Sequence, residues 1–186
     1  ALPAGYTWKF GRGFEENDKA IQTMSQNMLL AVVLIFLVMA SLFESALYPL
    51  SIITSIVFAI VGSIWFLTLT GTTITMMAMI GFMVLMGVVV NIGIVLIAHV
   101  IDLRHAGLPR HEAILQAGHD RLRPIMMTTL TTLLGMLPLA IGDAQVGGGG
   151  EGPAYYPLAR PIIGGLAFSA VVSLIILPVF YVWFDD

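Results

Sequence analysis

The sequence contains no cysteine and few charged residues, and both absences exclude classes of function. Without cysteine the chain can form neither disulfide bonds nor thiolate sites. Eight Lys and Arg against eleven Asp and Glu give a net charge of -3, and the basic residues are too few and scattered to follow a phosphate backbone. We therefore expect no nucleic-acid partner. Charged residues make up 10% of the chain and hydrophobic residues 58%, with a mean hydropathy of +0.95, which is typical of an integral membrane protein.

Patterns typical of catalysis and of metal binding are also missing. The Gly147 to Gly150 run lacks the lysine and the strand-to-helix setting of a phosphate loop. No combination of Ser, His and Asp, and no pair of intramembrane Asp residues, predicts hydrolysis within a bilayer. The histidines lack the three- or four-residue spacing that would place two metal ligands on one helix face. They are His99, His105, His111 and His119. We therefore expect no metal, no cofactor and no enzymatic activity.

The chain consists mainly of long apolar segments. The central one runs from Met76 to Leu103, with the polar Asn91 near its middle and Asp102 as its first certain charge. About 20 apolar residues cross the roughly 30 Å hydrocarbon core, and a continuous helix satisfies its own backbone there. The sequence predicts an all-α, polytopic membrane protein with five transmembrane helices. Their expected spans are about 28-48, 50-70, 76-103, 124-142 and 158-184.

The connections divide the chain into a short leading segment and a bundle. Residues 1-17 have the glycine and proline content of a loop, so we interpret them as the remnant of an aqueous domain and residues 18-186 as the helical bundle. The Tyr48-Pro49 pair predicts a break before the second span. Residues 104-123 form the longest polar connection between spans, for which we predict a short interfacial helix, with Pro124 starting the fourth span. Their arginines favour a cytoplasmic location.

Asn91 has two interpretations. In the first it hydrogen-bonds a neighbouring helix as a packing residue, and in the second it belongs to a proton or ion relay. Arg121 and Thr128 are seven residues apart and lie on roughly the same helix face. An arginine at the interface usually binds lipid phosphate, and a threonine in a helix usually bonds back to its own backbone. We find no acid in the middle of a predicted span, whereas proton-driven transport needs a group that changes charge inside the membrane.

Glycines recur on two of the predicted spans. Small residues allow two membrane helices to approach closely, so we interpret these glycines as packing residues. The packing set comprises Gly81, Gly87, Gly93, Gly164 and Gly165.

Four segments together resemble a known family. They are VMASLFESALYPL, GVVVNIGIVLI, RLRPIMMTTLTTLLGMLPLAIG and GGLAFSAVVSLIILPVFY. In this order they resemble the C-terminal transmembrane part, the eighth to twelfth membrane helices, of resistance-nodulation-division (RND) efflux permeases of the acriflavine-resistance type. The resemblance implies a fragment of a proton-coupled multidrug efflux transporter of the bacterial inner membrane. It also implies that residues 1-17 and 142-157 are periplasmic, and that the full permease is a trimer joined to a periplasmic adaptor and an outer-membrane channel.

The resemblance also implies which residues take part in proton transfer. Relay positions of the family fall on Asn91, Arg121 and Thr128, while the acids that carry the protons lie on a fourth helix that is absent from this sequence. The family commonly has a second Asn where Ile92 stands and an acid where Ala98 stands. We therefore expect that the chain does not transport without the missing N-terminal half. The alternative is a small membrane interaction or scaffold protein that associates through its glycine-lined helices within the lipid bilayer.

Overall fold

The computed structural model describes residues 12-44, 47-141 and 155-184, and this part consists of helices joined by turns, with no strand. The prediction of an all-α chain with five helices is confirmed there. Residues 1-11 of the predicted remnant and most of the predicted 142-157 connection lie outside the described residues. Residues 12-17, predicted to have the character of a loop, instead form the start of the first helix. The helices are α1 (Arg12–Phe43), α2 (Leu47–Leu69), α3 (Met76–His105), α4 (Arg110–Ile141) and α5 (Tyr156–Phe184).

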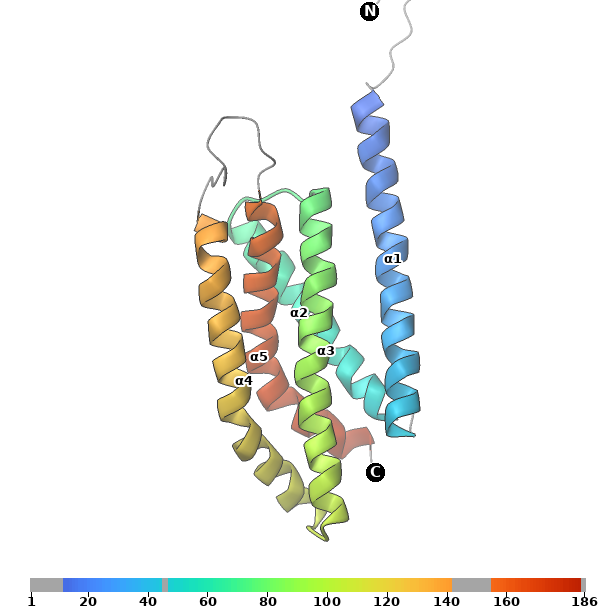
Figure 1. Cartoon of the computed structure of the whole chain (residues 1–186), viewed down its shortest axis with the longest axis vertical. Coiled ribbons are helices and arrows are strands. Elements are labelled where there is room, and N and C mark those ends of the chain that lie inside the picture. The colour runs from blue at the N-terminus through green and yellow to red at the C-terminus, as the bar shows by residue number, and fades with distance from the viewer. Residues whose placement is uncertain (1–11, 45–46, 142–154, 185–186) are drawn as a thin grey trace, which may run out of the picture.

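Successive helices alternate in direction, and α2 to α5 pack into one bundle (Figure 1). The first helix, α1, stands beside this bundle, contacts α2 and α3 but no other described helix, and extends beyond the other helices at its N-terminal end. Four helical segments are long and apolar enough to cross a membrane, and α5 contributes a shorter apolar segment, Tyr156–Val172, within the part of the chain that was searched. The four long segments are Lys19–Phe43, Tyr48–Leu69, Met76–His105 and His111–Ile141.

The core is built around α3, whose buried residues run from Ala78 to Val100. On one side Met86 and Ile97 pack with residues of α1, α2 and α4. On the other side Leu85 and Val89 pack with residues of α2, α4 and α5. Because α3 is packed on more than one side, its hydrophobic residues do not form a single stripe, and only a few of its positions remain exposed.

An N-terminal cap and a glycine with a positive φ define the two ends of α3. Thr75 caps the N-terminus, where its hydroxyl oxygen accepts a hydrogen bond from the Ala78 amide at 3.4 Å. At the other end Gly107 has φ of 93°, a left-handed conformation that glycine adopts without steric cost. Only residues 106-109 separate α3 from α4, so the two helices form an antiparallel hairpin.

The structure corrects the prediction of a separate interfacial helix. A single helix, α4, runs from Arg110 to Ile141 with Pro124 inside it, so Pro124 does not start the fourth span. Proline removes the hydrogen bond to the carbonyl four residues earlier, and α4 bends in the half that adjoins α3's C-terminus (Figure 1). Ile114 and Ala117 belong to the segment predicted to be interfacial, and the structure buries them in the core with residues of α3.

Pro49 is also placed differently from the prediction. It lies in the first turn of α2, which begins at Leu47, and not in a break before that helix. Proline suits this position because the amides of a first turn have no partner within the helix. The change of direction after α1 instead falls at Glu44, which has a positive φ of 49°.

Candidate functional site

Asn91 lies in the middle of α3 and is exposed at the surface of the bundle. It shares this exposed side with Gly87, four residues earlier, and with Val84, seven residues earlier. No described residue forms a hydrogen bond with its amide. The partner that the sequence analysis expects for Asn91 is therefore not supplied by the described part of this chain.

A His–Asp contact fixes the register between α3 and α4. His99 Nε2 lies 3.3 Å from Asp120 Oδ2, with side-chain exposures of 21% and 39%. Asn91 precedes His99 by eight residues, and Thr128 follows Asp120 by eight residues on the antiparallel helix. Counted along each helix at 1.5 Å per residue, both residues are about 12 Å from the His–Asp contact, which places them at about the same depth.

The threonines of α4 mostly bond to their own helix. The Thr128 hydroxyl donates to the carbonyl of Ile125 at 3.0 Å or of Pro124 at 3.2 Å, and the Thr132 hydroxyl donates to the Thr128 carbonyl at 2.8 Å. These contacts agree with the structural interpretation of a threonine in a membrane helix. Thr129 differs, because its hydroxyl oxygen is buried and has no hydrogen-bond partner in the described structure.

Arg121 lies two turns before Thr128 on α4 and is partly buried. Its Nε atom is enclosed and has no hydrogen-bond partner among the described residues. The register set by His99 and Asp120 places Ala98 level with Arg121, since each is one residue away from the contact. The small Ala98 offers Arg121 no acceptor side chain, although an acid at this position is common in the family that the sequence resembles.

Replacing Ala98 with glutamate should therefore stabilise the chain. A carboxylate at this level can accept from the Arg121 guanidinium, and we expect the free energy of unfolding to rise by about 1 kcal/mol. The measurement is unfolding of the chain in detergent followed by circular dichroism, with Ala98→Gln as the uncharged control. The gain should vanish when Arg121→Ala is added, and a gain that survives this second change would show that Arg121 is not the partner.

Four of the predicted packing glycines lie against a neighbouring helix. A Cβ atom on Gly81 would stand 2.6 Å from the Leu158 carbonyl oxygen, and one on Gly93 would stand 3.1 Å from the side chain of Ile52. Gly164 approaches Phe66 of α2, and Gly165 approaches the Ala59 carbonyl of α2. Gly87 does not pack in this way, because no atom lies within 4 Å of the position of its Cβ. It forms open surface one turn from Asn91.

The His99–Asp120 contact was missed by the sequence analysis, which considered the histidines only as metal ligands. The available signal was a histidine near the end of one long helix and an aspartate soon after the start of the next.

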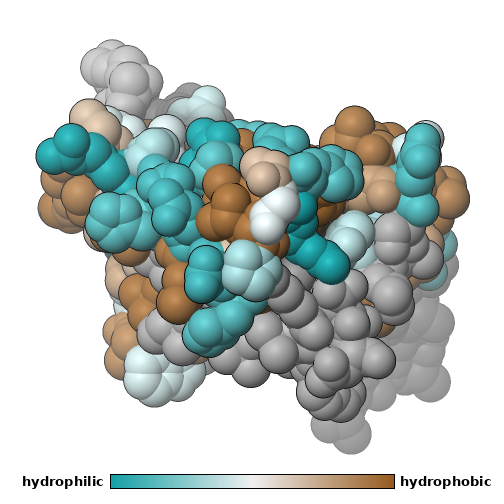
Figure 2. Space-filling view, turned by 90° about the horizontal axis from the view of Figure 1, so that it is seen from below, coloured by the Kyte–Doolittle hydropathy of each residue, from teal (hydrophilic) through white to brown (hydrophobic). Residues whose placement is uncertain are grey.

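Figure 2 shows the bundle from the end where α3 finishes and α4 begins. Hydrophilic residues gather there over the ends of the helices, while hydrophobic residues occupy much of the periphery. No group of three metal-ligating side chains was found in the described residues.

The comparison with known proteins identifies the family. Residues 1–185 match the sequence profile of the AcrB/AcrD/AcrF family. The chain belongs to this family of RND transporters. Members of this family are transporters and not enzymes, so the predicted family and the predicted absence of enzymatic activity are both confirmed.

The similar proteins are much longer than this chain. Swarming motility protein SwrC of Bacillus subtilis is 40% identical over 154 residues, covering 83% of this chain and 14% of SwrC. Multidrug resistance protein MdtC of Serratia proteamaculans is 38% identical over 168 residues, covering 88% of this chain and 16% of MdtC. A crystal structure of a heavy metal efflux pump superposes with a TM-score of 0.81 at 26% identity, over 99% of this chain and 18% of the pump. The chain thus spans less than a fifth of each.

Proposed function

We propose that this chain is the C-terminal transmembrane part of a proton-coupled multidrug efflux pump of the bacterial inner membrane, and that it acts together with an N-terminal half. The observation that carries the proposal is the exposed amide of Asn91 in the middle of a membrane helix. A polar side chain at that depth is unfavourable against lipid and normally faces the interior of a helical bundle. The missing half would cover it.

The exposed side chains of α3 and α4 point to one common face. Asn91 precedes the buried Ile92 by one residue, and Thr128 precedes the buried Thr129 by one residue. Each is turned by about 100° in the same sense from a neighbour that faces the core. Where the two buried neighbours face each other across an antiparallel pair, such equal turns point to the same side of the pair, so Asn91 and Thr128 would face one partner at one depth.

The chemistry of this face suits a supporting role in proton transfer. The Asn91 amide can donate to a carboxylate and accept from a protonated acid, and the Thr128 hydroxyl can do the same. Neither group gains or loses charge near neutral pH, so the proton carrier must come from the other half. Arg121, two turns away along α4, would favour the ionised form of an acid brought close to it.

The proposed topology follows from the alternation of the helices. All five helices would cross the membrane, with α5 crossing along its full length of 29 residues. The end that holds Asp102, Arg121 and Arg123 would face the cytoplasm, in keeping with the positive-inside rule. Residues 1-17 and 142-157 would then be periplasmic, the first as the remnant of an aqueous domain. The complete pump would assemble as a trimer with a periplasmic adaptor and an outer-membrane channel.

A resistance assay in an efflux-deficient bacterium tests the proposal. The chain is expressed alone and beside a matching N-terminal half that carries the fourth-helix acids, and its presence in the membrane is checked by immunoblotting. We expect resistance only when both parts are present, and we expect Asn91→Ala to abolish it. The matched control is Asn27→Ala, which removes an exposed amide from α1 and should leave resistance unchanged.

Two outcomes of the resistance assay would contradict the proposal. Resistance from the chain alone would show that it transports without fourth-helix acids. Absence of resistance with both parts present in the membrane would show that the chain is not a working component of the pump.

A further inference from the structure

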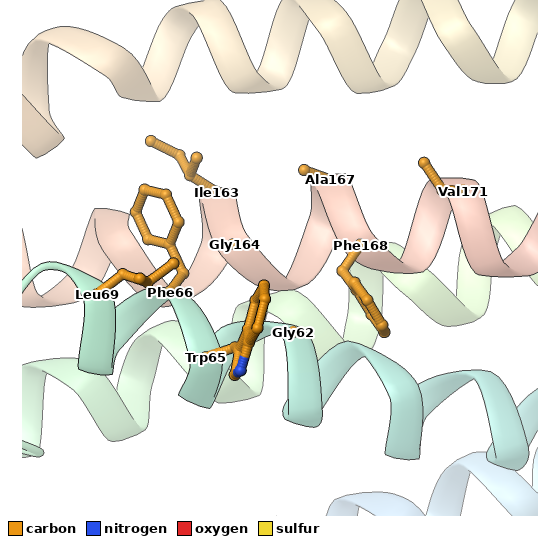
Figure 3. Close-up of a pocket in the computed structure, with 9 residues that line it drawn as sticks. All are labelled: Gly62, Trp65, Phe66, Leu69, Ile163, Gly164, Ala167, Phe168 and Val171. Atoms are coloured by element: carbon orange, nitrogen blue, oxygen red, sulfur yellow. The ribbon is translucent and has the colours of Figure 1, made fainter.

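A groove runs along the surface of the bundle between α2 and α5. It has a volume of about 380 Å³ and an almost wholly apolar lining. Gly62 and Gly164 form part of its floor, and the rings of Trp65, Phe66 and Phe168 rise beside them (Figure 3). The glycines let the two helices approach closely, since a side chain on Gly62 would collide with Phe168. The aromatic rings stand outside this line of contact and form the walls.

The groove occupies one half of the bundle and has the length of one membrane leaflet. Its α5 residues run from Ile163 to Val171, and its α2 residues run from Gly62 to Leu69. Eight residues of helix extend about 12 Å, and half of the hydrocarbon core is about 15 Å thick. Both segments lie toward the end of the bundle where α5 begins and α2 finishes (Figure 1). The groove is therefore open to the acyl region of a single leaflet.

A guanidinium group stands at the headgroup end of the groove. Arg160 lies one turn before Ile163, and Thr72 follows Leu69 by three residues. Arg160 Nη1 donates to Thr72 Oγ1 at 2.6 Å, and its Nε donates to the Ala140 carbonyl at 3.3 Å. The group lies 4.4 Å from the ring centre of Tyr156.

Arg160 retains unused hydrogen-bonding capacity. A guanidinium carries five N–H donors, and the structure gives protein partners to two of them. No carboxylate among the described residues pairs with Arg160. The contacts with Thr72, Ala140 and Tyr156 hold the group in one place, partly buried, and no carboxylate of the described residues compensates its charge. A fixed guanidinium of this kind is suited to bind a phosphate group through two parallel hydrogen bonds.

We propose that an anionic phospholipid binds at this site. Its phosphate would contact Arg160 beside the Thr72 hydroxyl, and one acyl chain would lie in the groove against Trp65 and Phe168. The site matches both parts of the lipid. The phosphate pairs with the guanidinium at the membrane interface, and the acyl chain packs against aromatic side chains deeper in the membrane. The proposal does not depend on transport.

Contact quenching of Trp65 tests the proposal. The whole chain with Trp8→Phe and Trp183→Phe, which leaves Trp65 as the single tryptophan, is reconstituted into phosphatidylcholine vesicles. Brominated phosphatidylglycerol or brominated phosphatidylcholine is then added, and quenching of the indole fluorescence gives the relative binding constant at the groove. We expect phosphatidylglycerol to be preferred by about fivefold, the factor that one basic residue contributes at an anionic lipid surface.

Three variants separate the site from general attraction to the membrane. Arg160→Gln should remove the preference, whereas Arg160→Lys should keep part of it. Arg123→Gln, which removes an exposed arginine at the opposite end of the bundle, should leave it unchanged. Ala167→Leu fills the groove from an exposed lining position and should weaken quenching by both lipids. Because Ala167 makes no contact with Arg160, this variant tests the groove even if Arg160→Gln misfolds.

Three results would overturn the proposal. Equal quenching by the two brominated lipids in the unmodified groove would exclude a specific headgroup contact. A preference that survives Arg160→Gln in a chain with normal helix content would exclude Arg160 as its source. Absence of quenching by either lipid would show that a protein segment covers the groove.

Discussion

Gly81→Ala is expected to destabilise the bundle by about 2 kcal/mol, because the added methyl group would meet backbone that cannot move aside. The position of its Cβ lies 2.6 Å from the Leu158 carbonyl oxygen in the first turn of α5, and Pro161 stands beside it at 3.4 Å. Relief would require α3 and α5 to separate along their length. The loss should appear as a lower midpoint of unfolding when helix content is followed by circular dichroism.

Gly87→Ala on the same helix provides the matched control. Its Cβ would have no atom within 4 Å, and alanine favours a helix over glycine by about 1 kcal/mol. We therefore expect a small gain in stability. If both substitutions destabilise the chain equally, the effect comes from helix propensity or from lipid contact and not from the approach of α5 to α3.

Asn91→Leu is expected to act in opposite directions on the isolated chain and on the assembled pump. Alone, the chain exposes an amide without a protein partner in the middle of α3, and its replacement should raise the free energy of unfolding in lipid by about 1–2 kcal/mol. With the N-terminal half present, the same change removes the group that would bond the facing acids. Resistance should then be lost although the chain is more stable.

Val84→Leu is the control for Asn91→Leu because it lies in the same exposed row on α3 and stays apolar. It should change neither stability nor resistance appreciably. Unfolding in lipid vesicles and the two-component resistance assay measure the two effects separately. A loss of stability in Asn91→Leu without the partner would contradict the exposed position of Asn91.

The helices could be predicted from the sequence, but their side-by-side contacts could not. Long apolar segments identify α1 to α5 because a membrane helix needs length and hydrophobicity, which are local properties. Gly81 and Gly87 look equivalent in sequence and differ only because α5, far along the chain, covers one and leaves the other open. Likewise, Pro124 is a common start of a helix, and only the packing of the preceding turns against α3 shows that α4 continues through it.

Less of the candidate site could be predicted than of the fold. Asn91 stands out because it is the strongly polar residue within a long apolar segment, and this signal needs no partner to be recognised. Its equal depth with Thr128 depends on the His99–Asp120 contact between two helices, which no spacing within one helix reveals. The site at Arg160 depends on three separate parts of the chain, Thr72, Ala140 and Tyr156, and had no sequence signal beyond an arginine near a helix start.

The short turn between α3 and α4 constrains how the proposed pump can move. Only residues 106-109 join these helices, and the His99–Asp120 contact ties them a second time farther along. Sliding one helix past the other by a single turn, about 5.4 Å, would strain the turn and break the contact. Asn91 and Thr128 should therefore keep the same relative height throughout a transport cycle. Any change in their hydrogen bonding during transport would then come from movement of the acids of the partner half, and not from movement of Asn91 relative to Thr128.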